Sequence, residues 1–204
     1  LNHPTLIPND AYELVTKLIN NMNIVLTQIV PGLKIGVKNL GNELSADSTV
    51  RTKIEIVSLK NSKEIPLKYE SEGIKKIISI LQLLIVLYNK ASITVAVDEF
   101  DSGVFEYLLG EMLRIISEKG KGQLIFTSHN LRPLETLDKS FIAFTTTNPD
   151  NRYIRFTNIK TNNNLRDFYY RDIVLGEQNE PVYEPTNNYE IALAFREAGE
   201  LSGS

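Results

Sequence analysis

The sequence predicts an α/β fold in which a mostly parallel sheet is flanked by helices. Helix-like and strand-like segments alternate between residues 73 and 127, in the order helix, strand, helix, strand. Residues 93–97 and 123–127 are short apolar runs, and such runs are typical of strands that are covered on both faces. Because strands that alternate with helices are joined by crossovers, we expect these two strands to run parallel.

The best-supported helix covers residues 73–88. Its apolar residues lie almost all round the helix, so it should be buried against the sheet. Gly73 allows a tight entry, and the Ser71 hydroxyl can accept a hydrogen bond from a first-turn amide. Residues 104–117 return to helical spacing, and Gly120 should end that helix.

The flanking segments are read in the same way. Residues 10–28 form a helix that Asn9 or Asp10 can cap, and residues 41–48 form a polar connector. Further strands are expected at residues 33–37, 50–59, 141–145 and 153–156, a loop at 161–164, and a short helix at 189–198. We divide the chain into an N-terminal helix with strands (1–60), a central lobe (61–147) and an extension of the same domain (148–204).

Composition is ordinary for a globular protein, but charge is distributed unevenly. The chain of 204 residues is 42% hydrophobic and 23% charged, with a formal net charge of −3, which gives no global case for nucleic-acid binding. Residues 51–76 nevertheless hold seven Lys or Arg against four Glu, and residues 177–200 hold six Glu against one Arg. The simplest interpretation of both biases is a solvated surface.

Cysteine and histidine usage limits the chemistry. The chain has no Cys, which excludes disulfides and thiolate metal sites and fits a reducing compartment such as the cytoplasm. His3 and His129 are its only histidines, so a histidine-rich metal centre is excluded. We find no signal peptide and no membrane span. Since Leu1 is not a natural start, we expect the chain to be part of a longer protein.

Two adjacent carboxylates, Asp98 and Glu99, follow the first predicted strand. Two consecutive residues that leave a strand point in different directions, so one carboxylate can face a metal and the other a nucleophile. His129 follows the second strand, at the same predicted edge of the sheet. The alternative is that these are ordinary polar residues at strand ends.

The turn that opens the 73–88 helix also has a candidate role. Gly73 lets the backbone approach a phosphate, and the helix start presents unpaired amides. The Ser71 hydroxyl adds a donor, and Lys75 lies in the first turn. The alternative is a simple helix cap.

Together these motifs resemble the C-terminal lobe of an ABC-type ATPase head, in the AAA family branch near the bacterial SMC and OLD proteins. The resemblance covers residues 64–147 most clearly, and implies a P-loop NTPase-like fold. Ser71, Gly73 and Lys75 match the signature motif, although Glu72 replaces its usual glycine. In such heads, the loop that follows the two strand-end carboxylates often has Asp at the position where this chain has Phe105. Asp101 or Glu106 is therefore left as the acid of that loop.

The resemblance implies a set of roles and ligands. Asp98 would hold Mg²⁺, Glu99 would be the catalytic base, and His129 would contact the γ-phosphate of ATP. Ser71, Gly73 and Lys75 would contact phosphate held by the opposite protomer of a homodimer. No Gly-x-x-x-x-Gly-Lys-Ser/Thr occurs in the chain, so the main phosphate loop is absent and the chain alone should be nearly inactive.

Other functions remain open at this point. One alternative is a non-enzymatic regulatory or interaction lobe of a split ATPase system. A second is a nuclease that uses Asp98, Glu99 and Asp101 around a metal. Members of this family are linked with phage defence and DNA-related processes, so nucleic acid or an effector protein are the partner classes that the resemblance suggests.

Overall fold

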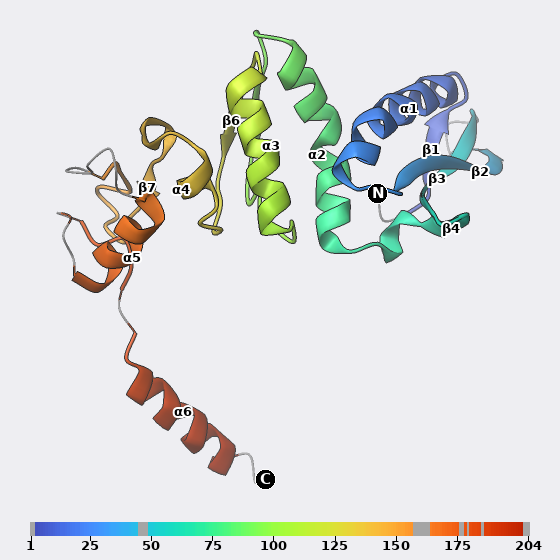
Figure 1. Cartoon of the computed structure of the whole chain (residues 1–204). Helices are drawn as coiled ribbons and strands as arrows, with labels where there is room; N and C mark the ends of the chain where they lie inside the picture. Colours follow the sequence, from blue (N-terminus) through green and yellow to red (C-terminus); the bar gives the residue numbers. More distant parts are fainter. Residues whose placement is uncertain are drawn as a thin grey trace. The chain divides into compact units, whose positions relative to one another are not determined.

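The computed structural model describes residues 3–44, 49–156, 164–175, 178, 180–184 and 186–201. The chain divides into two compact units, Leu1–Pro133 and Leu134–Ser204. Figure 1 labels many of their helices and strands. Residues 161–163 of the predicted 161–164 loop and residues 45–48 of the predicted 41–48 connector lie outside the described residues.

The first unit contains most of the regular structure. Its elements are β1 (Thr5–Pro8), α1 (Ala11–Ile29), β2 (Lys34–Leu44), β3 (Val50–Lys60), β4 (Lys63–Pro66), the 3-10 turn η1 (Leu67–Tyr69), α2 (Glu72–Asn89), β5 (Thr94–Val97), α3 (Glu106–Lys119) and β6 (Gln123–Phe126). The predicted helices and strands of this region are therefore confirmed, with shifted ends. β2 also runs into the predicted polar connector, past a register shift between Asn39 and Asn42.

An antiparallel sheet forms one half of this unit. Its strand order is β1-β3-β2, and β4 pairs with β3. Helix α1 packs on the sheet, as Figure 1 shows, through a buried stripe of Ile19, Met22 and Leu26. The side chain of Asn23 secures this packing, because it accepts the amide of Ile35 and donates to the Ile35 carbonyl, both at 2.8 Å.

The predicted mostly parallel sheet is wrong. Among the described residues, β5 and β6 form the only parallel pair, and the other pairs are antiparallel. The physical reason is connection length: β2, β3 and β4 follow one another without helices, so each strand turns back on the previous one. Within the described residues, only α3 provides a crossover between neighbouring strands.

The two parallel strands are also not covered on both faces. In β5, Val95 and Val97 are buried, whereas Thr94 and Ala96 are exposed. On β6, Ile125 keeps 54% of its surface exposed. One face therefore packs on the helices, and within the described part of the chain nothing covers the other.

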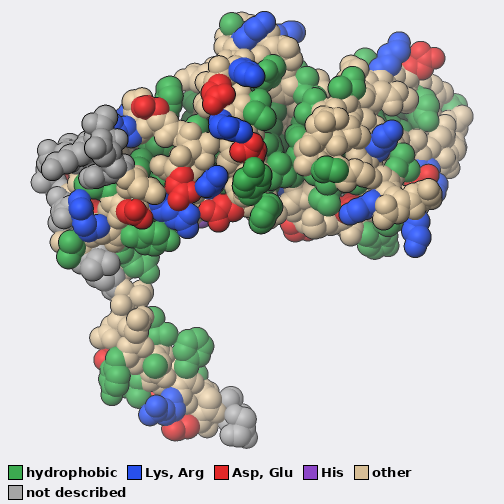
Figure 2. All heavy atoms as spheres, viewed as in Figure 1, with side chains coloured by type: hydrophobic (Ala, Val, Ile, Leu, Met, Phe, Trp, Pro, Cys, Tyr) green, Lys and Arg blue, Asp and Glu red, His purple; other side chains and the backbone are tan. Residues whose placement is uncertain are grey.

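The second unit is smaller. It contains α4 (Pro133–Thr136, which begins at the boundary), η2 (Lys139–Phe141), β7 (Phe144–Thr145), β8 (Tyr153–Ile154), α5 (Leu165–Leu175) and α6 (Asn188–Leu201). A turn joins β7 to β8, with a hydrogen bond from the amide of Asn151 to the carbonyl of Asn148. Helix α6 exposes Tyr189, Ile191 and Phe195, and Figure 2 shows hydrophobic side chains along it.

Candidate functional site

The ends of β5 and β6 bring the predicted acidic residues next to Thr127. The strands pair in register, Val97 opposite Phe126, so the residues that follow them leave the sheet side by side. Thr127 Oγ1 donates a hydrogen bond to Asp98 Oδ1 at 2.5 Å and accepts the amide of Glu99 at 2.8 Å. One hydroxyl therefore sets both the Asp98 carboxylate and the backbone that carries Glu99.

Glu99 lies in a conformation that glutamate rarely adopts. Its φ is +48°, in the left-handed region, and its carbonyl accepts the amide of Ser102 at 3.0 Å to close a tight turn. Such a conformation costs about 1–2 kcal/mol for a residue with a side chain. Strain of this kind persists where the surrounding structure imposes it, and it is frequent at functional sites. The Glu99 side chain is exposed at this turn.

Asp101 holds the loop that carries His129. Its Oδ1 accepts the amide of His129 at 3.3 Å, and its Oδ2 accepts the amide of Asn130 at 3.0 Å. The His129 side chain itself is exposed. Asp101 and Glu106 were the two candidates for the acid of the loop that follows Glu99. The Asp101 carboxylate is engaged within its own chain, and Glu106 begins α3.

The turn before α2 has the predicted cap. Ser71 Oγ accepts the amide of Ile74 at 3.3 Å, and the Ser71 carbonyl accepts the amide of Lys75. The ammonium group of Lys75 pairs with Glu72 at 2.6 Å, and Glu72 remains largely exposed. Lys75 is therefore neutralised within the turn rather than presented as a free cation.

A close backbone contact joins this turn to the loop after Glu99. Gly73 is buried, and a Cβ atom placed on it would lie 1.9 Å from the carbonyl oxygen of Gly103. Gly103 has φ +69°, and a Cβ there would lie 2.8 Å from the amide nitrogen of Gly73. The structure therefore requires glycine at position 73 for packing within the chain, and its predicted contact with phosphate stays a prediction.

Sequence reasoning missed Lys76 and Thr127, and it named Asp101 only for other roles. Lys76 Nζ donates to the backbone carbonyl of Asp98 at 2.8 Å and ties α2 to the end of β5. The roles of Thr127 and Asp101 were also not predicted. The only signal for them was position, since each follows a strand end that carries a predicted site residue.

The described residues contain no group of three or more His, Cys, Asp or Glu side chains that could hold a metal ion. In particular, Asp98, Glu99 and Asp101 do not converge, because the Asp101 carboxylate turns to the His129 loop. The arrangement offers separate acidic and histidine side chains at one sheet edge. Such side chains suit a phosphate that arrives with a bound metal ion better than a metal ion held by protein ligands alone.

Comparison with known proteins gives a fold likeness only. No family model and no curated protein matches the chain. A chain from work on ATP-driven dimerisation and DNA-stimulated activation of SMC ATPases is 11% identical, with a TM-score of 0.55, and the match covers 83% of this chain and 99% of that one. The fold resembles that of an SMC ATPase head.

Longer SMC heads match more weakly. An Smc head domain with a coiled coil and joint from Pyrococcus yayanosii is 14% identical, with a TM-score of 0.49, over 72% of this chain and 28% of that one. An Smc head bound to the C-winged helix domain of ScpA is 14% identical, with a TM-score of 0.44, over 60% of this chain. The present chain spans 37% of that second chain.

One further structural fact concerns membranes. Within the described ranges, none of the helices combines the length and the apolar character that a bilayer crossing requires.

Proposed function

We propose that the chain is the C-terminal lobe of an ABC-type ATPase head, which binds and hydrolyses ATP at a site shared between two heads. The observation that carries this proposal is the common edge of β5 and β6. Asp98 and Glu99 leave one strand there, and Thr127 and His129 follow its parallel neighbour. The likeness of fold to an SMC ATPase head, at a TM-score of 0.55, supports it.

In this proposal the two carboxylates have different tasks. Glu99 orients and deprotonates the water that attacks the γ-phosphate, and its strained, exposed position suits a group that must reach a ligand. Asp98 would supply a ligand to the metal ion. His129 contacts the γ-phosphate from the neighbouring loop, which Asp101 holds by two backbone amides.

This arrangement can offer a Mg²⁺ ion one protein ligand. Mg²⁺ commonly keeps several waters and takes one or two protein carboxylates besides phosphate oxygens. Asp98 has one oxygen committed to Thr127, while its Oδ2 has no hydrogen-bond partner among the residues that the structure describes. Asp98 can therefore supply one ligand, and a bound Mg²⁺ would neutralise charge on the phosphates.

The start of α2 would act on the nucleotide of the opposite protomer. Ser71 and the first amides of α2 can donate to phosphate, aided by the positive end of the helix. Gly73 keeps this helix start in place through its close packing on Gly103. Lys75 contributes only if it leaves Glu72, so we assign it the smallest share of this contact.

The test is ATP turnover by the intact protein that contains this chain together with a phosphate loop. Glu99→Gln should keep nucleotide binding and lower turnover by about 100-fold or more. The matched control is Glu118→Gln, which removes the charge of an exposed carboxylate at the end of α3 and should keep full turnover. Near wild-type hydrolysis by Glu99→Gln would remove Glu99 from the mechanism. Absence of hydrolysis in the intact wild-type protein would favour a regulatory lobe instead.

The biological setting is part of the proposal as well. A role in a DNA-related process or in phage defence rests on the family resemblance alone. Cleavage of DNA by the chain with metal and without ATP would support the nuclease alternative, which the separated acidic side chains do not favour.

A further inference from the structure

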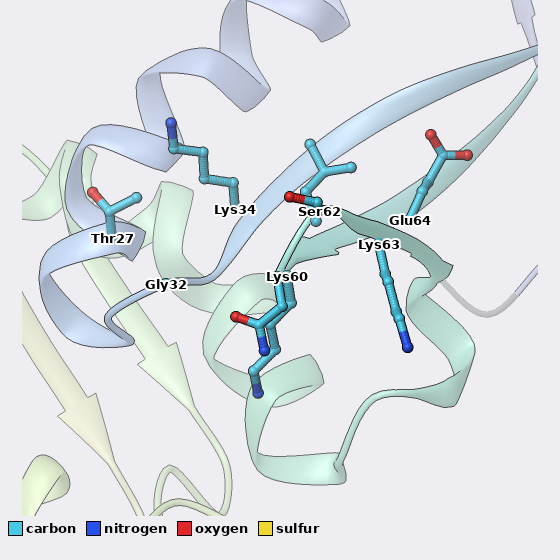
Figure 3. A pocket seen from close by; sticks show the side chains of 9 residues that line it. Thr27, Gly32, Lys34, Lys60, Ser62, Lys63 and Glu64 are labelled. Atoms are coloured by element: carbon cyan, nitrogen blue, oxygen red, sulfur yellow. The ribbon is translucent and has the colours of Figure 1, made fainter.

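A pocket of about 590 Å³ lies where β2 begins and where β3 turns into β4. Three lysines line it, but Lys34 extends to one side of the hairpin, whereas Lys60 and Lys63 extend to the other (Figure 3). Ammonium groups that diverge in this way do not converge on one anion, so the pocket gives no basis for a ligand site. A more complete set of polar contacts lies at the ends of β5 and β6, around Thr127.

Thr127 is hydrogen-bonded to four consecutive residues at and after the end of β5. Its amide donates to the carbonyl of Val97 at 3.2 Å, and its carbonyl accepts the amide of Phe100 at 3.0 Å. Between these two backbone bonds, its hydroxyl bonds to Asp98 and to Glu99. A valine at this position would keep the two backbone bonds and lose the two that the hydroxyl makes.

Chemistry fixes the direction of the two hydroxyl bonds. A backbone amide can only donate, so the Thr127 oxygen accepts from the amide of Glu99, at 2.8 Å. The hydroxyl proton is then directed at Asp98 Oδ1, at an oxygen–oxygen distance of 2.5 Å. The result is a chain of hydrogen bonds from the Glu99 amide through the hydroxyl to the Asp98 carboxyl group. Bonds in such a chain strengthen one another.

This chain of bonds helps to hold Glu99 in its left-handed conformation, at φ +48°. The Glu99 amide is fixed by the Thr127 hydroxyl, and its carbonyl is fixed by the amide of Ser102. The next residue, Phe100, is 1% exposed, and its ring centroid lies 5.4 Å from that of Phe126. Among the residues that the structure describes, Thr127 supplies the only side-chain bond to the Glu99 backbone.

We propose that Thr127 is a positioning residue for Glu99, whose hydroxyl holds the backbone from which the Glu99 carboxylate reaches the attacking water. This inference rests on the proposed function, in which Glu99 is the base. Thr127 acts through Glu99 and not on the nucleotide. Because a misplacement of about 1 Å can lower turnover about 100-fold, loss of the hydroxyl should appear in kcat.

The first test measures ATP hydrolysis by the intact protein that contains this chain and a phosphate loop. Thr127→Val should lower kcat about 10- to 100-fold and leave the KM for ATP near that of the wild type. Thr127→Ser keeps a hydroxyl that can donate and accept, so its kcat should stay near the wild-type value. Circular dichroism melts verify that both variants are folded at the assay temperature.

The matched control removes a threonine hydroxyl from the other end of the same strand pair. Thr94 is paired with Gln123 at the start of β5 and β6, and the Thr94 hydroxyl bonds to the side-chain oxygen of Gln123 at 3.4 Å. Thr94→Val should therefore leave kcat near that of the wild type.

The second test uses the present chain and needs neither ATP nor a metal ion. Hydrogen exchange at the Glu99 amide, followed by NMR, should become about 10-fold faster or more in Thr127→Val. Thr127→Ser and Thr94→Val should leave it near the wild-type rate. Asp98→Ala should also speed this exchange, since the hydroxyl loses the acceptor that orients it. The double variant Asp98→Ala/Thr127→Val should exchange no faster than Thr127→Val alone, because both changes act on one hydroxyl.

The outcomes separate this inference from the proposed function. Equal loss of kcat in the Val and Ser variants would overturn the inference, since the hydroxyl would then not be the cause. Unchanged kcat or unchanged Glu99 exchange in Thr127→Val, while Glu99→Gln stops turnover, would overturn it and leave the proposed ATPase standing. Full turnover by Glu99→Gln would refute the proposed function and the catalytic part of this inference together. The exchange rates would still decide whether Thr127 holds the Glu99 backbone.

Discussion

A Cβ atom on Gly73 would lie 1.9 Å from the carbonyl oxygen of Gly103. The two glycines belong to the start of α2 and to the loop after Glu99, so these segments touch at the level of the backbone. The same loop carries Asp101, which holds the amides of His129 and Asn130. The turn with Ser71 and the loop with His129 are therefore linked through one short segment.

We predict that Gly73→Ala destabilises the first unit by about 1–3 kcal/mol, because the backbone must shift to admit the methyl group. Urea unfolding followed by circular dichroism measures the change. Gly199→Ala is a suitable control, since a Cβ atom there meets nothing within 4 Å. If Gly73→Ala unfolds at the wild-type midpoint, the close contact between the two glycines is wrong.

The hydroxyl of Thr127 gives a second prediction. Thr127→Val keeps the shape of the side chain but removes the acceptor for the Glu99 amide and the donor to Asp98. We expect a loss of about 1 kcal/mol of stability, since water can reach these groups and replace part of the bonding. Thr127→Ser keeps the hydroxyl and should retain most of the wild-type stability. Equal stability of the Val and Ser variants would show that the hydroxyl has no such role.

Asp101 gives a third prediction, on local order rather than overall stability. Asp101→Asn replaces one acceptor oxygen by an amide group, so it cannot accept both backbone amides. Hydrogen exchange at His129 and Asn130, followed by NMR, should become about 10-fold faster or more, as expected for loss of roughly 1.4 kcal/mol of local protection. Glu118→Gln should leave these rates unchanged. Unchanged exchange in Asp101→Asn would mean that its carboxylate does not hold the loop.

Several features of the site could be predicted from the sequence because they depend on local patterns. The cap at Ser71 follows from a hydroxyl residue before an apolar helix, and it is present. The placement of Asp98 and Glu99 at the edge of a parallel pair follows from two apolar runs separated by a helix. His129 follows the second strand for the same reason.

Other features depend on contacts between segments that are distant in the sequence. No repeating sequence pattern marks such contacts, so they could not be predicted. The bonds from Asp101 to two amides and from Lys76 to the Asp98 carbonyl join residues that lie 22 to 29 positions apart in the chain. The pairing of Lys75 with Glu72 is local, but the family resemblance had assigned Lys75 to a phosphate contact instead. The direction of the first sheet was also missed, because β-branched runs look alike in parallel and antiparallel strands.

A fourth prediction concerns Ser71 and requires the intact protein of the proposed function. Ser71 is exposed at the start of α2, while Asp98 and His129 follow strands at the sheet edge. If Ser71 serves the nucleotide of the opposite protomer, Ser71→Arg should add bulk at the contact surface. It should abolish ATP-induced dimerisation, measured by size-exclusion chromatography with light scattering, and leave nucleotide binding by the monomer intact.

Mixing two defective proteins then decides whether Ser71 acts across the dimer. Ser71→Arg protein is combined with a variant that lacks a working phosphate loop. In a mixed dimer, one shared site receives both lesions and the other receives neither, so part of the ATPase activity should return. If Ser71 instead serves its own protomer, each site keeps one lesion and no activity returns. Mixed dimers detected by differential tags, without recovered hydrolysis, would therefore refute the assignment across the dimer.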